Sequence, residues 1–349
     1  MSERVIVNAS SGEYPVVIGE ELDPGKLALE TRKPCKAIIV SDDIVFPIYG
    51  DIVTKSFEGA GFETTPFIIF NGESSKTLTT VERLLGFLSK QNLTRSDLLV
   101  ALGGGVVGDI AGFAAAIYLR GVSYIQLPTT ILAAVDSSVG GKTGVNLSSG
   151  KNLAGAFHQP IGVFCDTRAF ATLPKEVFTG GMAEVVKYGM IADKELLGSS
   201  LSIEDICLRC VGIKAGVVAK DEFDKGERMK LNFGHTVGHA IEKLSGYRIP
   251  HGPAVATGMV MMTKAGERAG LTSPGCLPTL QKALAVYGLD AACDFSAGEL
   301  ADAILHDKKR SGEHITLIIP ETVGKVILHK LPAEKVQGFI SGETPHGVK

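Results

Sequence analysis

This sequence of 349 residues has no tryptophan, only six cysteines and no long apolar run. A membrane helix needs about 18 consecutive apolar residues, and no segment approaches that length. Lys and Arg total 35 against 38 Asp and Glu, so no excess of positive charge indicates a nucleic-acid partner. The opening residues MSERVIVNAS lack the basic start and apolar centre of a signal peptide. We therefore expect a soluble cytoplasmic protein without membrane or nucleic-acid partners.

The cysteines are too few in a chain of this length to form a disulfide scaffold. Cys207 and Cys210 are spaced as CxxC, but a zinc knuckle needs a second such pair. The other four cysteines stand alone in the sequence. We expect Cys207 and Cys210 to be buried thiols one helical turn apart.

Short apolar runs alternate with helical patterns in the first half of the chain. The strand-like runs are residues 36–42, 66–73, 96–105 and 122–130, and the helical patterns between them are residues 50–61, 76–92 and 106–121. Such alternation builds a parallel sheet with helices on both faces. Helical patterns dominate from about residue 174 to about residue 310, and the strand-like residues 314–331 have no assigned place. We predict an α/β domain over 1–174 and a mainly helical domain over 175–349.

Two glycine-rich segments in the first domain indicate anion binding. GGGVVG at 103–108 fits GxGxxG between a strand and a helix, where backbone N–H groups attract a pyrophosphate. The acidic residue usual about 20 positions later is absent, so Asp42 is the alternative partner for a ribose hydroxyl. Glycines that serve only helix–sheet packing are the competing interpretation. DSSVGGKTG at 136–144 is not a P-loop, because Asp136 stands where the first glycine should be, but Lys142 lies in a stretch suited to an anion.

Two histidines lie four residues apart in LNFGHTVGHAIE, residues 231–242, on one face of a predicted helix. Thr236 replaces the glutamate of HExxH, which excludes a zinc protease. Glu184 and His251 could complete a site with two histidines and one carboxylate, as in catalytic zinc sites. Hydrogen-bonded core histidines are the alternative, and spacing does not choose between His235 and His239.

Positively charged residues lie in or near the segments that carry these glycines, histidines and Glu184. They are Lys142, Lys151, Lys187, Lys214, Arg228, Lys308 and Lys309. A single lysine is more often a solvated surface group, but a cluster beside a metal predicts a substrate with phosphate and carboxylate groups. Arg228 precedes His235 by one heptad, so a continuous helix would place both near one side.

These segments together resemble the 3-dehydroquinate synthase family of sugar-phosphate cyclases. The resemblance rests on GGGVVGDIAGF, QLPTTILAAVDSSVGGKTGVN, GKNLAGAFHQP, AEVVKYG, LNFGHTVGHA, HGPAVATGM and DKK, and it runs from about residue 35 to beyond residue 310. One departure is Pro253, where the family commonly has glutamate. The resemblance implies a dehydroquinate synthase-like fold, with an NAD-binding Rossmann-like α/β domain followed by a mainly α-helical metal- and substrate-binding domain. It also implies that the protein binds a divalent metal such as zinc or cobalt and forms a homodimer.

The resemblance also implies the roles of individual residues. The metal ligands would be Glu184, His235 and His251, which leaves His239 to the substrate. The positions that match NAD binding are Asp42, Asn71, Gly72, Glu73, Lys76, Gly104, Gly105, Val106, Val107, Gly108, Asp109, Thr129, Thr130, Asp136, Lys142, Lys151, Ala169, Phe170 and Thr172. Those that match the substrate site are Lys142, Asn152, Lys187, Lys214, Arg228, Asn232, His239 and Lys308, with Arg120 reaching the phosphate from a neighbouring subunit.

The implied activity is that of a phosphorus–oxygen lyase of the shikimate pathway, which serves aromatic amino acid biosynthesis. A heptulosonate phosphate would become 3-dehydroquinate and phosphate through transient NAD-dependent oxidation, β-elimination of phosphate, re-reduction and intramolecular aldol closure. Three alternatives stay open. They are a different sugar-phosphate cyclase, a metal-dependent polyol dehydrogenase, and a regulator built on a catalytically inactive scaffold.

Overall fold

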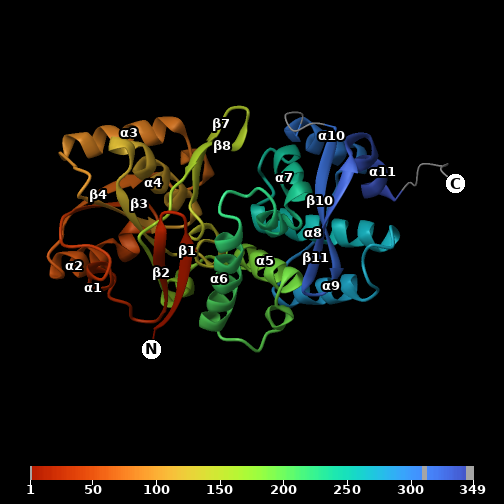
Figure 1. Ribbon diagram of the computed structural model, residues 1–349, viewed down its shortest axis with the longest axis horizontal. Helices are drawn as coiled ribbons and strands as arrows, with labels where there is room; N and C mark the ends of the chain where they lie inside the picture. Colours follow the sequence, from red (N-terminus) through yellow and green to blue (C-terminus); the bar gives the residue numbers. More distant parts are fainter. Residues whose placement is uncertain (1, 309–312, 343–349) are drawn as a thin grey trace. The chain divides into compact units, whose positions relative to one another are not determined.

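The chain, seen here in a computed structural model, divides into two compact units (Figure 1). Unit 1 comprises Met1–Pro174 and Ile203–Phe223, and unit 2 comprises Lys175–Ser202 and Asp224–Lys349. The structure describes residues 2–308 and 313–342, and for residues 306–308 it describes the backbone only. None of the described helices is both long enough and apolar enough to cross a membrane.

Unit 1 is built on a seven-stranded sheet in the order β1-β2-β9-β6-β5-β3-β4. The strands are β1 (Glu3–Ala9), β2 (Gly12–Gly19), β3 (Lys36–Asp42), β4 (Glu63–Ile69), β5 (Leu98–Gly103), β6 (Ser123–Pro128) and β9 (Gly162–Asp166). Neighbouring strands run parallel except β1, which forms an antiparallel hairpin with β2 at one edge. The predicted α/β fold class is confirmed, although β4 begins and ends a few residues before its predicted position.

Helices cover both faces of this sheet (Figure 1). Helices α1 (Pro24–Leu29) and α2 (Asp51–Gly59) pack on one face, where Phe57 is fully buried. Helices α3 (Leu78–Lys90) and α4 (Gly105–Ile117) pack on the other face. All six residues of the interior strand β5 are buried, which explains why its sequence is apolar throughout rather than alternating.

A second, two-stranded sheet carries part of the predicted site. Strands β7 (Lys142–Leu147) and β8 (Gly150–Phe157) form an antiparallel hairpin that packs against α4. A Cβ atom at Gly155 would lie 2.2 Å from the carbonyl oxygen of Thr143, so only glycine fits this close approach. This hairpin is not evident from the sequence, because its glycines obscure the strand pattern.

Helix α6 (Ile203–Lys220) lies in unit 1, whereas the predicted division placed this segment in the second domain. The helix packs against β1, β2 and η4 (Ala133–Ser137). Cys207 and Cys210 are both buried in it one turn apart, and neither forms a disulfide, as expected. An amphipathic helix has no sequence feature that says which of two cores its apolar face joins, so only tertiary packing decides this assignment.

Unit 2 is mainly helical. Its elements are α5 (Lys175–Ile191), η6 (Lys194–Leu197), η7 (Glu227–Asn232), α7 (His235–Leu244), α8 (His251–Arg268), α9 (Cys276–Val286), α10 (Ala297–Lys308), β10 (His314–Thr322), β11 (Lys325–Pro332), η8 (Ala333–Lys335) and α11 (Val336–Ser341). The strand-like residues 314–331 form the β10–β11 hairpin, which packs against α8 (Figure 1). One apolar core joins these helices and the hairpin.

Candidate functional site

Three side chains from three helices of unit 2 converge on one point. Glu184 lies in α5, His235 begins α7 and His251 begins α8. One carboxylate oxygen and one ring nitrogen of each histidine all lie within 4.8 Å of one another. An acid and two imidazoles at this spacing could hold a divalent metal ion.

Glycines bring these helices close enough for the cluster to form. A Cβ atom at Gly252 would lie 2.3 Å from the carbonyl oxygen of Gly180, so α8 and α5 meet backbone to backbone. A Cβ atom at Gly258 would lie 2.0 Å from the carbonyl oxygen of Gly234, which fixes α8 against the start of α7. Gly234 itself has φ +80°, a left-handed conformation that favours glycine.

The Glu184 carboxylate is almost completely buried, at 1% exposure. Its Oε1 lies 3.0 Å from His251 Nε2 and 3.5 Å from His235 Nε2, and its Oε2 pairs with the equally buried Lys187 ammonium. A buried carboxylate is stable only with such partners, because loss of hydration disfavours its charge. Glu184 and Lys187 are three residues apart in α5, so their side chains meet on one face of the helix.

His235 is held as a neutral imidazole with one nitrogen directed at Glu184. Its Nδ1 lies 3.1 Å from the carbonyl oxygen of Phe233, so Nδ1 carries the proton and donates it there. Burial, reinforced by the nearby Lys187 charge, lowers the pKa of His235 to about 3 despite the attraction of Glu184. The Nε2 lone pair is therefore available at neutral pH, as a metal ligand requires.

His251 has the opposite electrostatic environment. Burial opposes its protonation, but hydrogen bonds to Glu184 and Glu242 outweigh burial and raise the pKa of His251 to about 9. Its Nε2 faces Glu184, and its Nδ1 lies 3.4 Å from Oε2 of the buried Glu242 in α7. Glu242 is not among the site residues predicted from the sequence. Its position seven residues after His235, on the same helical face, was the available signal.

His239 also belongs to the histidine group. Its ring centroid lies 5.5 Å from that of His235 and 6.2 Å from that of His251. With Glu242 and His251 it forms a second set of side chains with metal-ligand spacing. His239 is exposed, however, whereas Glu184 is buried. The set that contains Glu184 is therefore better shielded from water than the set that contains His239.

The polar and charged residues predicted for the substrate site in unit 2 lie in different elements. Arg228 is buried at 2% exposure in η7, and Asn232 ends the same short helix. The continuous helix that would place Arg228 and His235 near one side does not form, because η7 ends at Asn232 and the left-handed Gly234 separates it from α7. Lys308 ends α10, and neither its side chain nor Lys309 lies within the described part of the structure.

In unit 1 the glycine-rich turn joins β5 to α4, at the carboxyl edge of the sheet. Gly104 precedes the helix and no side chain caps it, so the first N–H groups of α4 point outward as in an anion site. Thr129 N–H donates to the carbonyl oxygen of Gly103 at 3.0 Å, which brings the end of β6 beside this turn. Gly108 also packs closely, since a Cβ atom there would lie 2.5 Å from Oε1 of Gln126 and the Gln126 side chain would have to move.

Asp42 lies at the same edge, but both of its carboxylate oxygens already accept hydrogen bonds within the chain. Oδ1 accepts the backbone N–H groups of Ile44 and Val45 at 3.0 and 2.8 Å, and Oδ2 accepts from the Asn71 amide at 3.2 Å. These bonds fold the turn after β3. Among the other predicted cofactor residues, Val106 and Val107 lie in the first turn of α4. The rest lie in turns or short 3-10 helices, namely Gly72, Glu73, Thr130, Ala169, Phe170 and Thr172.

Two buried lysines of unit 1 contact carboxylates at this edge. Lys76 Nζ lies 2.5 Å from Asp109 Oδ2 and 2.6 Å from the side-chain oxygen of Asn152. Burial raises the pKa of the Asp109 carboxyl, and the Lys76 ammonium partly offsets this. Lys214 on α6 pairs with Asp136 in η4 and also donates to its backbone oxygen at 2.7 Å. The structure thus brings together residues that lie up to 78 positions apart.

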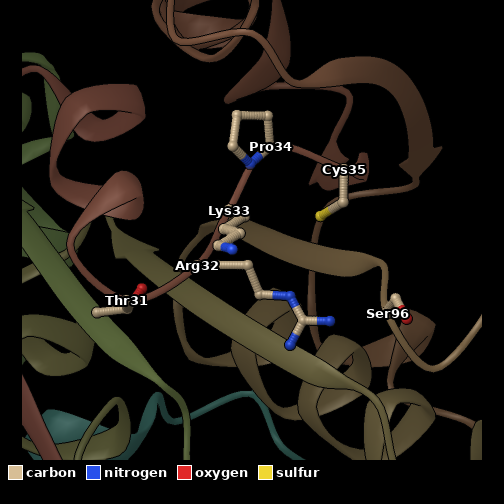
Figure 2. A pocket seen from close by; sticks show the side chains of 6 residues that line it. All are labelled: Thr31, Arg32, Lys33, Pro34, Cys35 and Ser96. Carbon is tan, nitrogen blue, oxygen red and sulfur yellow. The ribbon is translucent and has the colours of Figure 1, made fainter.

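A cavity of about 360 Å³ lies elsewhere in unit 1. Figure 2 shows its lining by Thr31, Arg32, Lys33, Pro34, Cys35 and Ser96. These residues precede β3 and β5, at the amino edge of the parallel sheet. Ligands of such sheets bind at the carboxyl edge, so this cavity takes no part in the candidate site.

Comparison with solved structures defines the class of protein. A 2-deoxy-scyllo-inosose synthase complexed with carbaglucose-6-phosphate, NAD+ and Co2+ aligns with a TM-score of 0.88 and 26% identity, over 97% of this chain and 99% of that chain. The 2-epi-5-epi-valiolone synthase of Streptomyces hygroscopicus, with NAD+ and Zn2+ bound, shares the fold with a TM-score of 0.85 and 22% identity, over 94% of this chain and 96% of that one. The fold is that of the sugar-phosphate cyclases.

Sequence comparison then narrows the class. The 3-dehydroquinate synthase N-terminal model matches residues 66–180 and the C-terminal model matches residues 181–310. The 3-dehydroquinate synthase of Streptococcus sanguinis is 42% identical over 97% of this chain and 99% of its own length, and that of Enterococcus faecalis is 44% identical over 89% and 90%. This chain belongs to the 3-dehydroquinate synthase family.

Proposed function

We propose that this chain converts 3-deoxy-D-arabino-heptulosonate 7-phosphate into 3-dehydroquinate and phosphate. The observation that carries the proposal is the convergence of Glu184, His235 and His251 in a chain whose family models cover residues 66–310. The reaction eliminates phosphate and closes a carbocycle without net oxidation, which makes the enzyme a lyase of the shikimate pathway.

Glu184, His235 and His251 would hold the divalent ion. The donor set fits zinc or cobalt, because it offers one buried carboxylate, one imidazole kept neutral by burial and one imidazole whose proton a metal can displace. When bound, NAD+ supplies a reversible hydride acceptor, and the ion supplies a Lewis acid for the reacting oxygen. Glu242 would orient the His251 ring through its second nitrogen.

In unit 1, the N-terminus of α4 would bind the pyrophosphate of NAD+. The uncapped N–H groups after Gly104 support this placement, together with the neighbouring Thr129 and Thr130 at the end of β6. Glu73 and Asn71, in the turn after β4, would face the ribose side of the cofactor. Asp42 contributes mainly by shaping the turn after β3, since its carboxylate already accepts three N–H donors.

The cations would bind the two anionic groups of the substrate. In unit 1, Lys142 and Asn152 would contact the phosphate and Lys214 the carboxylate. In unit 2, His239 would contact the phosphate and Arg228 the carboxylate, with Lys187 and Asn232 beside the reacting carbons. The substrate phosphate can accept the proton during its own elimination, so these residues act chiefly by positioning.

Arg120 would act in a neighbouring copy of a cytoplasmic homodimer. The support for this role is the backbone conformation and exposure of Arg120 and its neighbours. Leu119 and Arg120 have φ of 50° and 65°, and both are exposed, as is Ile117 beside them. Two adjacent non-glycine residues in this conformation are costly, and strain of this kind is usually maintained for a function.

The deciding experiment follows phosphate release from the heptulosonate phosphate in the presence of NAD+ and Zn2+ or Co2+. We expect stoichiometric phosphate and carbocycle with no accumulation of NADH absorbance. Net NADH production from simple polyols would instead establish a dehydrogenase. Turnover of a hexose phosphate but not of the heptulosonate would establish a different cyclase.

A further inference from the structure

Asn146, on strand β7, joins two segments that the proposed function assigns to different ligands. Its side-chain Nδ2 donates to Glu73 Oε1 at 2.7 Å, and its Oδ1 accepts the backbone N–H of Asn152 at 2.8 Å. Its own backbone N–H donates to the carbonyl oxygen of Lys76 at 2.8 Å. One amide therefore connects the turn at residues 73–76 to the start of β8.

The residue that Asn146 holds has an unusual backbone. Asn152 has φ 54°, in the left-handed region, which asparagine tolerates better than most residues but still adopts at some cost. Residues in this conformation persist when their surroundings impose it. The bond from Asn152 N–H to Asn146 Oδ1 spans the hairpin at this point and supplies that restraint.

The side chain of Asn152 is oriented as well. Its Oδ1 accepts from Lys76 Nζ at 2.6 Å, and the same ammonium pairs with Asp109 at the start of α4. An amide has one acceptor end and one donor end. With the oxygen turned toward Lys76, Nδ2 is the end that Asn152 offers to an oxygen of an anionic ligand.

We propose that Asn146 is a positioning residue for substrate binding: it holds Asn152 in the left-handed conformation that presents its Nδ2 donor to the substrate phosphate. The inference rests on the proposed function, which assigns Asn152 to that phosphate. It adds a residue that contacts neither substrate nor cofactor and acts through the backbone of its neighbour.

The first test replaces Asn146 by alanine. A contact made equally in the ground and transition states affects KM, so we expect KM for the heptulosonate phosphate to rise about tenfold while kcat falls less than about threefold. The Kd of NAD+ should stay within about twofold, because Lys151 still lies 4.0 Å from Glu73. Ser149→Ala is the matched control, since Ser149 is exposed in the turn of the same hairpin.

A rescue experiment separates positioning from general destabilisation. Asn146→Asp keeps an acceptor for Asn152 N–H but sets a carboxylate against Glu73, so its KM should also rise. In the double variant with Glu73→Gln, the new amide can donate to the new carboxylate. We expect the KM of the double variant to be at least about threefold lower than that of Asn146→Asp, because the effects of substitutions at contacting residues are coupled.

Amide hydrogen exchange gives a readout that needs no substrate. The Asn152 amide should be protected in the wild type and in the rescued double variant, and should lose that protection in Asn146→Ala. Unchanged exchange at Asn152 together with a normal KM in Asn146→Ala would overturn the inference. A wild-type enzyme that releases no phosphate would instead overturn the proposed function.

Discussion

His251 Nε2 lies 3.0 Å from Glu184 Oε1, at the point where helices α8 and α5 meet through glycine backbones. The other nitrogen of the same ring lies 3.4 Å from Glu242. An imidazole with a carboxylate at each nitrogen is stabilised in its doubly protonated form, which is why its pKa is raised to about 9 in the metal-free chain.

Metal binding should therefore release a proton near neutral pH. His251 is protonated below about pH 9 without metal, and a metal ion binds only the deprotonated ring. The apparent metal affinity should rise about tenfold per pH unit between pH 7 and pH 9, and level off above that. Calorimetry in buffers of different ionisation enthalpy should give about one proton released at pH 7. Binding without proton release would show that His251 is not a ligand.

Glu242→Gln should weaken metal binding without removing a ligand. The carboxylate that orients His251 through Nδ1 would become an amide, and loss of such a partner typically costs about 10- to 100-fold in metal affinity. Competition with a chelator of known affinity measures the change. Glu195→Gln, at an exposed position of unit 2, is the control and should bind metal normally. Equal affinities in the two variants would contradict this role for Glu242.

The two histidines of α7 should respond differently to replacement. His235→Ala removes the neutral ring beside Glu184, so the purified protein should contain less than about a tenth of the wild-type metal. His239→Ala should retain the metal and lose substrate turnover. Elemental analysis after dialysis distinguishes the two, with circular dichroism as the check on folding. The reverse pattern would favour the second set, formed by His239, Glu242 and His251.

The proposed homodimer can be tested by complementation. Arg120→Ala and His251→Ala should each be inactive as pure variants. If Arg120 serves the neighbouring copy, a mixed dimer contains one intact site, so an equimolar co-expressed mixture should regain about a quarter of wild-type activity. Recovery requires mixed dimers, which can be isolated when the two variants carry different affinity tags, and size-exclusion chromatography with light scattering confirms that they are dimers. An inactive mixture that contains mixed dimers would place Arg120 in its own subunit's site.

Local patterns predicted most of unit 1. The buried strand 36–42 was predicted with its observed bounds, because an apolar run flanked by polar residues has few other conformations available. The glycine turn before α4 was likewise evident, since glycine between a strand and a helix permits close approach. The hairpin β7–β8 was missed, because its glycines serve packing between two backbones and leave no alternating side chains to detect.

The sequence by itself determined which chemical groups this protein has: an acid, three histidines, a set of lysines and a glycine-rich turn in a parallel α/β unit. Tertiary structure alone decided which of them meet. Packing turns His235 toward Glu184, joins α6 to the first unit and sets Asn146 between Glu73 and Asn152. Sequence spacing fixes neighbours only within one helix or strand, whereas these contacts cross between elements and depend on how closely backbones can approach.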